Sequence, residues 1–385
     1  MAERIDVSSL DAVGFRLYKA HGGQASLATR DTISEILKEA STKIDGHKFG
    51  RHFLLAEWEQ IVDARQLEAW EEYRDVPRLG RKTRLSDTHR KTLWSIFEIV
   101  RTDLKMKDLI TKAGLFTELA GIVAANKDRP YDFAVVDEAQ DISIPQLRFL
   151  VALGANYRNA LFFAGDLGQR IFQQPFSWKS FGVDIRGRSH TLRVNYRTSH
   201  QIRTQADRLI GPEVADGDGN REDRRDTVSV FNGPSPLIRV LMDEDEERQT
   251  VVDWISTQVT IGIPLHEIGI IVRSGAQLDR AKSAVQKLKL PVKILDERVE
   301  TANGHVSICT MDLAKGLEFR VVAVMACDDE VVPLQERIEM IGDDADLQEV
   351  YDTERYLLYV ACTRARDHLL ITSVKPSSEF LDDLL

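Results

Sequence analysis

Cysteine is scarce in this chain of 385 residues, which has three cysteines, at Cys309, Cys327 and Cys362. They lie far apart among apolar neighbours, and the chain contains no C-x-x-C pair. This pattern argues against a zinc site and against a disulfide framework. We therefore expect three buried thiols in a reducing compartment.

Long apolar runs are also lacking. No run approaches the roughly 18 residues that a membrane-spanning helix needs, and residues 1–10 have no apolar core of signal-peptide length. We expect a cytoplasmic protein with no membrane partner. Hydrophobic residues make up 43% of the chain and charged residues 29%, a balance typical of folded globular domains.

An excess of positive charge is missing as well, because the formal net charge is −10. This value argues against a protein that binds nucleic acid by bulk electrostatics alone. It leaves room for a local basic channel, so the motifs must decide the question.

The pattern of apolar and polar residues changes near Pro130. Before it, residues of about 28–128 have a helical pattern, in which four apolar side chains fall on one face: Leu93, Phe97, Val100 and Leu104. After it, short apolar runs alternate with helical segments and end in polar residues, which is typical of a parallel α/β sheet. We predict two α/β domains, residues 1–190 with a helical insertion at about 28–128, and residues 191–385.

The second domain is expected to alternate strands and helices. Its strands are predicted at 228–231, 237–241, 269–272, 306–310, 321–326 and 368–372, and its helices at 243–260, 276–288 and 353–363. Residues 211–226, rich in Gly, Asp and Arg, are expected to form a loop, and the tail after Lys375 is expected to fray.

An acidic pair follows the first predicted strand of this α/β region, in Val135-Val-Asp-Glu-Ala-Gln-Asp141. In a nucleotide-driven motor the first carboxylate holds Mg²⁺ through water and the second polarises the attacking water. Asp137 is therefore our candidate metal residue and Glu138 our candidate general base. Such a pair is also common in a solvated loop or a helix N-terminus.

Two further blocks follow. In Ala164-Gly-Asp-Leu-Gly-Gln169, Gln169 is placed to sense a terminal phosphate, or is a plain polar loop residue. In Leu192-Arg-Val-Asn-Tyr-Arg-Thr198, Tyr196 could stack on a purine and Arg197 could bind a phosphate with its planar fork. Surface Tyr-Arg pairs are common, so this block is weak evidence by itself.

The fourth block, Thr310-Met-Asp-Leu-Ala-Lys-Gly-Leu-Glu-Phe319, joins two predicted strands. Glu318 could accept a hydrogen bond from a ribose hydroxyl, and Thr310 and Lys315 could lie near phosphates or a nucleic-acid backbone. The alternative is a simple connection in which Gly316 makes the turn.

The fifth block, Tyr356-Leu-Leu-Tyr-Val-Ala-Cys-Thr-Arg-Ala-Arg366, is a helix with Arg364 at its end. An arginine supplied across a cleft stabilises transition-state charge and is worth ~10³–10⁵ in rate in such motors. Arg355 and Arg366 are expected to make salt bridges instead.

In order and spacing, the five blocks resemble motifs II, III, IV, V and VI of superfamily-one helicases of the UvrD/Rep/PcrA type over roughly residues 130–373. The resemblance implies two RecA-like parallel-sheet domains of the P-loop NTPase type, the first incomplete. ATP with Mg²⁺ would bind between them, and single-stranded or partly duplex DNA would lie across them.

The same resemblance assigns roles to individual residues. Asp137 would serve Mg²⁺, and four residues would carry the chemistry: Glu138, Gln169, Arg197 and Arg364. The nucleotide would otherwise be bound by Tyr196 at adenine and Glu318 at ribose, with Lys315 and Gly316 beside them.

Motif I of that family is absent, because no G-x-x-x-x-G-K-S/T occurs in the chain. The nearest match, Gly80-Arg-Lys-Thr83, has the wrong spacing and follows no predicted strand. Without the backbone nest and its lysine, the β- and γ-phosphates have no cradle. We expect a truncation, a split gene or a wrong start codon, with an upstream segment or a partner chain supplying the loop.

The chain departs from the family's pattern at three further points. The family's base-stacking aromatic corresponds to Gln174 here, so the stacking candidates are Phe172, Phe176 and Trp178, with core packing the other reading for Trp178. Asp312 replaces a histidine of motif V and would repel a phosphate. The family's large helical insertion between Arg273 and Thr310 is also expected to be absent.

Two hypotheses remain. The first is part of an ATP-dependent DNA helicase or translocase that is inactive without its phosphate loop. The second is a non-catalytic descendant that binds nucleic acid or a partner. The first hypothesis is favoured by the presence of Glu138, Gln169, Arg197 and Arg364, because a protein that no longer hydrolyses ATP does not need them.

Overall fold

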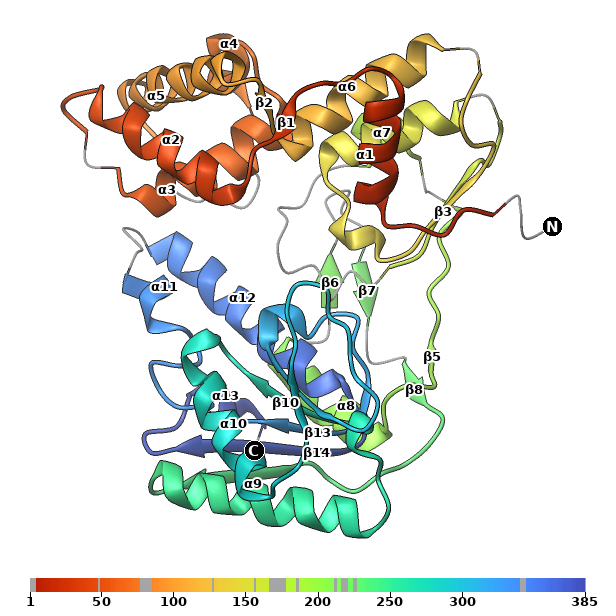
Figure 1. Ribbon diagram of the computed structural model, residues 1–385, viewed down its shortest axis with the longest axis vertical. Helices are drawn as coiled ribbons and strands as arrows, with labels where there is room; N and C mark the ends of the chain where they lie inside the picture. The colour runs from red at the N-terminus through yellow and green to blue at the C-terminus, as the bar shows by residue number, and fades with distance from the viewer. Residues whose placement is uncertain are drawn as a thin grey trace. The chain divides into compact units, whose positions relative to one another are not determined.

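The computed structural model describes residues 5–47, 49–76, 85–126, 128–155, 157–165, 178–184, 187–210, 213–215, 221–223, 227–339 and 344–384. Contacts divide the chain into two units, with the division between Arg188 and Ser189 (Figure 1). Each unit has its own hydrophobic core. No described helix is long and apolar enough to cross a bilayer.

The first unit contains a group of helices with a separate core. They are α2 (Arg30–Thr42), α3 (Arg51–Glu57), the π-helix η2 (Trp58–Asp63), α4 (Trp70–Asp75) and α5 (Asp87–Met106). The side chains of Thr29 and Ser86 cap α2 and α5 by accepting backbone amide hydrogen bonds. The predicted face of α5, from Leu93 to Leu104, is buried in this core, which confirms the helical periodicity.

The rest of the first unit is a small α/β body. It consists of α1 (Leu10–Ala20), α6 (Lys112–Ala125), α7 (Ile144–Gly154) and the parallel strands β3 (Ala134–Val136) and β4 (Leu161–Phe163). The chain passes between body and helical group at the parallel pair β1 (Ser26–Leu27) and β2 (Leu109–Ile110). Helix α6, predicted within the insertion, packs with α7 in the body core.

The two strands of this body have contrasting faces. Alternate residues of β3 and β4 pack against the body core, whereas Val135 and Phe162, which lie opposite each other, are 78% and 63% exposed. Parallel sheets are normally covered on both faces. The outer face of β3 and β4 is therefore an uncovered apolar surface.

The second unit is built on a fully parallel sheet, in the order β11-β12-β10-β13-β14-β9. Its strands are β9 (Leu237–Leu241), β10 (Ile268–Val272), β11 (Val292–Ile294), β12 (Val306–Thr310), β13 (Phe319–Val324) and β14 (Ala365–Val374). Helices α9 (Glu244–Thr260) and α10 (Leu278–Lys287) share one core with the sheet. Helices α8 (His200–Ala206) and α12 (Asp344–Thr363) also pack on the sheet, and the predicted parallel α/β class is confirmed.

Between β10 and β12 lie only a 3-10 turn, α10 and β11, so the prediction that no large helical insertion occurs there is confirmed. Two short parallel strands, β5 (Val194–Asn195) and β8 (Val228–Ser229), precede the main sheet, and α11 (Gln335–Glu339) precedes α12. The three cysteines are free and buried, as expected.

Three local predictions are wrong. The sequence of residues 3–20 predicts a short strand followed by a helix, but residues 5–9 have no regular structure before α1. The segment expected to be a loop contains the antiparallel strands β6 (Glu213–Ala215) and β7 (Arg221–Asp223). The tail ends in α13 (Phe380–Leu384), whose apolar side chains are buried because Phe380 packs edge-on against Tyr351 and lies under the guanidinium of Arg355.

Candidate nucleotide and nucleic-acid site

The acidic pair lies where β3 ends, at the carboxyl edge of the small sheet. Asp137 and Glu138 are both exposed, and Oδ1 of Asp137 accepts a hydrogen bond from the amide of Glu138 at 2.9 Å. Glu138 has a φ of 52°, a left-handed conformation that costs a side-chain-bearing residue about 1–3 kcal/mol. Such strain in a strand-end acid is common at functional sites.

A buried glutamine that the sequence analysis did not single out supports this turn. Gln140 is 5% exposed, and its Nε2 donates to Oε2 of Glu138. A Cβ built on Gly165 would lie 2.4 Å from Oε1 of Gln140, so a larger residue at this position would displace the Gln140 side chain. The amide of Ala139 also donates to the carbonyl of Ala164 at 2.8 Å, which ties the ends of β3 and β4 together.

The predicted phosphate sensor Gln169 and the stacking candidates Phe172 and Phe176 lie outside the described residues. Trp178 is described and is partly buried against the body core. Its ring meets that of Phe163 edge-on, with centroids 4.9 Å apart. This contact matches the core-packing reading of Trp178, so its stacking on a base stays a prediction.

In the second unit the Asn-Tyr-Arg block forms a side-chain-stabilised turn. Oδ1 of Asn195 accepts hydrogen bonds from the amides of Arg197 and Thr198, at 2.8 and 3.1 Å. This arrangement is an Asx turn, which asparagine favours because its short side chain mimics a backbone carbonyl. The turn leaves the ring of Tyr196 74% exposed, where it is accessible to a planar ligand.

Two of the predicted site residues meet at one backbone carbonyl, and a third pairs with one of them. The carbonyl oxygen of Leu317 accepts from the Nη2 atom of Arg197 and, at 3.3 Å, from the Nη1 atom of Arg364. The Nε atom of Arg197 lies 3.0 Å from Oε2 of Glu318. Motifs IV, V and VI therefore converge at the amino ends of β13 and β14.

The two arginines differ in exposure. The side chain of Arg197 is 36% exposed, whereas Arg364 is 2% exposed and its Nε also donates to the carbonyl of Val360 at 3.0 Å. In this arrangement Arg197 is the more accessible cation. An anion can meet Arg364 only after its side chain turns outward.

The remaining residues of the fourth block lie around this point or at the opposite sheet edge. Thr310 ends β12 at the carboxyl edge, paired with Val272. Lys315 is partly exposed, and Gly316 has a φ of 79° in the turn that brings the chain back to the amino edge. The predicted glycine turn is present, and the DNA or phosphate roles of Thr310 and Lys315 stay predictions.

An ion network that the sequence analysis missed surrounds Asp312. Arg273, 3% exposed, binds Glu354 through two hydrogen bonds of 2.6 Å and reaches Oδ2 of Asp312 at 3.1 Å. The charge of Asp312 is thus matched by its own unit, which weakens the expected repulsion of a phosphate. The only sequence signal was a charged residue directly after a buried strand.

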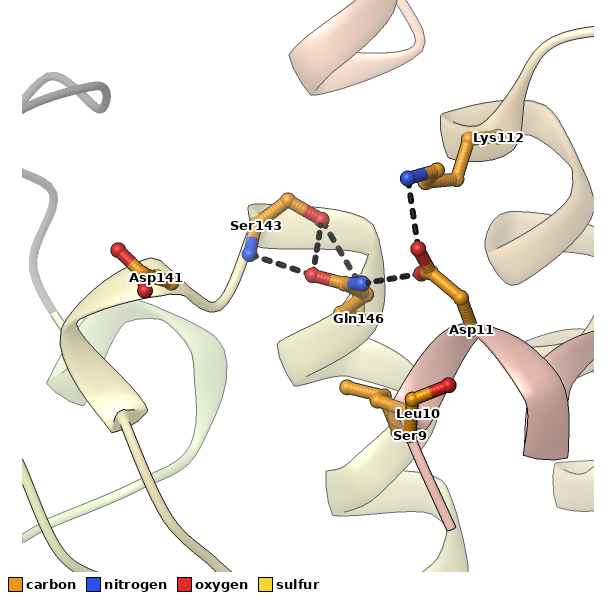
Figure 2. A pocket seen from close by; sticks show the side chains of 7 residues that line it. All are labelled: Ser9, Leu10, Asp11, Lys112, Asp141, Ser143 and Gln146. Carbon is orange, nitrogen blue, oxygen red and sulfur yellow. Dashed lines mark hydrogen bonds and ion pairs between the residues drawn. The ribbon is translucent and has the colours of Figure 1, made fainter. Parts of the chain in front are cut away.

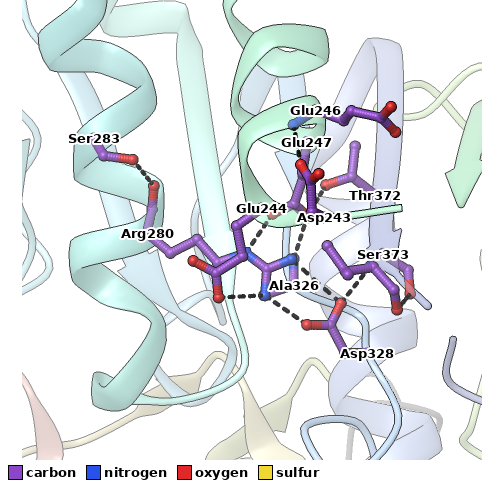
Figure 3. A network of polar contacts seen from close by, with 11 residues as sticks. Asp243, Glu244, Glu246, Glu247, Arg280, Ser283, Ala326, Asp328, Thr372 and Ser373 are labelled. Atoms are coloured by element: carbon purple, nitrogen blue, oxygen red, sulfur yellow. Dashed lines mark hydrogen bonds and ion pairs between the residues drawn. The ribbon is translucent and has the colours of Figure 1, made fainter. Parts of the chain in front are cut away.

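A second missed network joins the ends of β13 and β14 to α9 and α10 (Figure 3). Glu247 is fully buried and accepts from Arg280, from Oγ1 of Thr372 at 2.6 Å and from the amide of Ala326 at 3.0 Å. Arg280 also reaches Asp328 at 2.5 Å. The carboxylates keep the pKa of Arg280 raised despite its burial. The expected salt bridges of Arg355 and Arg366 are present, with Asp383 and Asp367.

A pocket of about 380 Å³ lies in the first unit where the N-termini of α1, α6 and α7 meet (Figure 2). Asp11 joins the three helices, accepting from Lys112 at 2.6 Å and from Gln146 at 3.0 Å. Among the lining residues Lys112 is the single base and Asp141 adds a second acid. The pocket therefore offers a phosphate no net positive charge.

Two family models match the chain. The UvrD/REP helicase N-terminal domain matches residues 7–178, and the UvrD-like helicase C-terminal domain matches residues 296–376. The order of the two matches is the order in which the two units follow each other.

Several curated proteins are similar over parts of the chain. A probable DNA helicase of Mycoplasma pneumoniae is 23% identical over 256 residues, which are 64% of this chain and 44% of that protein. The ATP-dependent DNA helicase UvrD2 of Mycobacterium tuberculosis is 27% identical over 50% of this chain and 28% of its own length. The helicase PcrA of Staphylococcus aureus is 41% identical over 20% of this chain and 10% of its own.

The match spans less than half the length of each of these relatives. Among solved structures, the C-terminal domain of a possible DNA helicase from a Lactobacillus is 21% identical with a TM-score of 0.36, covering 50% of this chain and 94% of that one. Because both domain models of one family match in their proper order, and the similar curated proteins are DNA helicases, the chain belongs to the UvrD-like family of superfamily-one helicases.

Proposed function

We propose that this chain forms part of an ATP-dependent DNA helicase or translocase, and that it needs a phosphate-binding loop from polypeptide outside these 385 residues. The observation that carries the proposal is that Arg197 and Arg364 share the Leu317 carbonyl while Glu318 pairs with Arg197. Three segments far apart in sequence place two cations and an acceptor together, which is what a nucleotide requires at its phosphate and ribose ends.

In this proposal the first unit supplies the hydrolytic acids. Exposed carboxylate oxygens suit Mg²⁺, and the described residues contain no cluster of three or more metal-ligating side chains. Asp137 would therefore hold the ion together with phosphate oxygens, and the ion would neutralise phosphate charge. Glu138, oriented by Gln140, would take a proton from the attacking water.

The uncovered face of β3 and β4 supports the second part of the proposal. Beside Val135 and Phe162, the stacked rings of Phe133 and Tyr157 are 64% and 49% exposed. A strand with a phosphate loop and a following helix would extend this sheet and cover that face, next to the acids that it must serve.

DNA-stimulated ATP hydrolysis tests both parts. We expect negligible turnover by the 385-residue chain, and turnover after addition of a polypeptide that carries a strand, G-x-x-x-x-G-K-S/T and a helix. Glu138→Gln in the same mixture should lower kcat by at least about 10²-fold, since general-base contributions are of order 10²–10⁴. Robust hydrolysis by the chain alone would refute the missing-loop part.

One observation favours a second candidate, a binding protein that no longer hydrolyses ATP. Arg364 is buried and bonded to carbonyl groups of its own unit, so it can reach a phosphate only after its side chain turns outward. If the loop-bearing polypeptide restores ATP binding without hydrolysis, and Arg364→Ala changes nothing, the non-catalytic reading replaces the first.

A further inference from the structure

Two arginine side chains lie along the C-terminal half of α7. Arg148 belongs to the helix, and the centre of its guanidinium lies 5.2 Å from the centre of the Phe181 ring. Arg129, from the segment before β3, donates a hydrogen bond to the carbonyl of Ala152, one turn further along the helix. The Nε atom of Arg129 is buried and has no hydrogen-bond partner in the described part of the chain.

Three more basic residues belong to the same region. Arg158 lies in the turn that leaves α7, and Arg188 donates to Oδ1 of Asn159 in that turn. Lys179 begins the 3-10 turn η5 (Lys179–Phe181), which supplies the aromatic ring just described. All three basic side chains are exposed. Three segments that are separate in the sequence therefore bring five cations to one end of α7.

These five cations form the α7 basic cluster: Arg129, Arg148, Arg158, Lys179 and Arg188. None of them forms an ion pair with a carboxylate in the ranges that the structure describes. Elsewhere the chain behaves differently, because acidic residues outnumber basic ones by 61 to 51 and buried arginines such as Arg273 and Arg280 bind carboxylates. Burial lowers the pKa of Arg148, and no carboxylate acts in the other direction.

The end of a helix offers a simpler explanation for part of this cluster. A helix C-terminus stabilises a nearby cation by about 0.3–1 kcal/mol. This accounts for Arg129, which binds a carbonyl of the last turn of α7. It does not account for Arg148 in the middle of the helix, or for Lys179 on another segment. Positive charge stays in excess, since the three segments carry only three acids among their described residues: Asp128, Asp132 and Asp184.

We propose that the α7 basic cluster binds the phosphodiester backbone of a nucleic-acid strand, at a site separate from the nucleotide. Guanidinium groups suit this ligand because their planar donors can bind two phosphate oxygens at once, and four of the five cations are arginines. A nucleic-acid strand carries a phosphate at every nucleotide, so it presents the row of anions that the cluster lacks within its own chain.

The position of the cluster separates it from the hydrolytic acids. Gly154 ends α7 beside Leu161, the first residue of β4, where a Cβ on the glycine would lie 2.9 Å from the leucine side chain. The cluster therefore lies at the amino edge of the small sheet, whereas Asp137 and Glu138 lie at its carboxyl edge. A strand bound there contacts neither the acids nor the ATP that they would serve. The inference thus goes beyond the proposed function and requires neither the phosphate loop nor turnover.

The first test measures binding of a fluorescein-labelled oligothymidylate of about 20 nucleotides to the whole chain, by fluorescence anisotropy without ATP. The double variant Arg158→Gln/Lys179→Gln removes two exposed cations whose side chains make no hydrogen bond or ion pair in the described ranges, so the fold should persist. Each phosphate contact of a single strand contributes about 0.7 to the slope of log K against log salt concentration, so the slope should fall by about 1.4. The loss of affinity should then be about sevenfold larger at about 50 mM salt than at about 200 mM.

A second double variant, Arg248→Gln/Lys287→Gln, is the matched control. It makes the same change in net charge on α9 and α10 of the second unit, where both side chains are bonded to neighbouring residues. Its affinity for the oligonucleotide should equal that of the wild type. An equal loss in both double variants would reduce the effect to net charge and overturn the proposal. So would a salt slope in Arg158→Gln/Lys179→Gln that matches the wild type.

The second test locates the contact in the unaltered chain. Arginine labelling with phenylglyoxal, read peptide by peptide by mass spectrometry, should show that the oligonucleotide protects Arg158 and Arg188 and leaves Arg248 at its free rate. Protection confined to the second unit would refute the site. Poly-L-glutamate at the same concentration of negative charge should displace the oligonucleotide less well than unlabelled oligothymidylate does, and equal displacement would assign the cluster to an acidic polypeptide instead. Neither test involves hydrolysis, so the proposed function stands or falls separately.

Discussion

Asp63, at the end of the π-helix η2, is a carboxylate whose ionisation the folded chain opposes. Burial raises its pKa to about 6, although hydrogen bonds from Oγ1 of Thr111 and Nε2 of Gln66, both 2.6 Å, act in the other direction. Nearby Glu59 adds a repulsive negative charge. Thr111 caps α6, so this carboxylate joins the helical group to the body of the first unit.

The sign of the effect follows from linkage. The folded state holds the Asp63 proton more tightly than the unfolded state, whose pKa is near the reference value of 3.8. The extra stability is therefore fully present below that value and is lost as the pH rises through about 6. The difference between 3.8 and about 6 in the pKa of Asp63 corresponds to about 3 kcal/mol, and solvent access to part of the side chain makes this an upper value.

Asp63→Asn removes the ionisation and keeps an oxygen that can accept from Thr111. We expect the free energy of opening of the helical group to rise by about 1–2 kcal/mol at pH 7, less than the full 3 because the neutral amide accepts more weakly. The decline in stability between pH 4 and 6.5 should become shallower by the Asp63 contribution.

Hydrogen exchange of peptides from residues 51–67, read by mass spectrometry across this pH range, measures the effect locally. Glu35→Gln is the control, because Glu35 makes an exposed pair with Arg51 in the same helical group and should matter by under about 0.5 kcal/mol. The same pH slope in Asp63→Asn as in wild type, or weaker protection at pH 7, would show that the reasoning is wrong.

Three further predictions concern the second unit. Glu247→Ala should lower the free energy of unfolding by about 3–5 kcal/mol in urea titrations, because it removes a buried carboxylate partner of Arg280; an effect under 1 kcal/mol would contradict the network. Asn195→Ala should lower the free energy of unfolding by about 0.5–2 kcal/mol and loosen the turn before Arg197, measured by hydrogen exchange of its peptide. Burial raises the pKa of the Cys309 and Cys362 thiols to about 12, so an aromatic disulfide reagent at pH 8 should label them only as fast as the chain unfolds.

Five of the six strands in the main sheet of the second unit were predictable because each is an apolar run bounded by polar residues, whereas the short β11 was missed. The bounds of β9 and β12 agree with the prediction to the residue, since Leu237 and Val306 begin runs with clear ends. The apolar residues of α13 were misread because a five-residue helix carries too little periodicity to be separated from a polar tail.

The site was predictable only at the level of side-chain type. Arg197, Glu318 and Arg364 were identifiable as candidate ligand-binding groups, but the acceptor that the two arginines share is the backbone carbonyl of Leu317, which no residue pattern encodes. Pairing of Arg280 with Glu247 and Asp328 joins three separate segments, so it depends on the strand order and not on local sequence.

The two edges of the second unit's sheet are unlike, and the difference bears on how the unit could act. In open α/β sheets, ligands usually bind beyond the carboxyl ends of the strands. Here that edge is occupied by paired charges, with Arg280 bound to Glu247 and Asp328. Arg197, a cation accessible to solvent, lies near the amino end of β13.

A unit with this arrangement is poorly suited to hold a nucleotide at the usual edge, because the arginine there is already neutralised. It is suited to present Arg197, and Arg364 after it turns outward, to phosphates that another polypeptide holds. We infer that this unit would contribute to a nucleotide site by completing it, and that its affinity for ATP should fall when Arg197 is replaced by alanine.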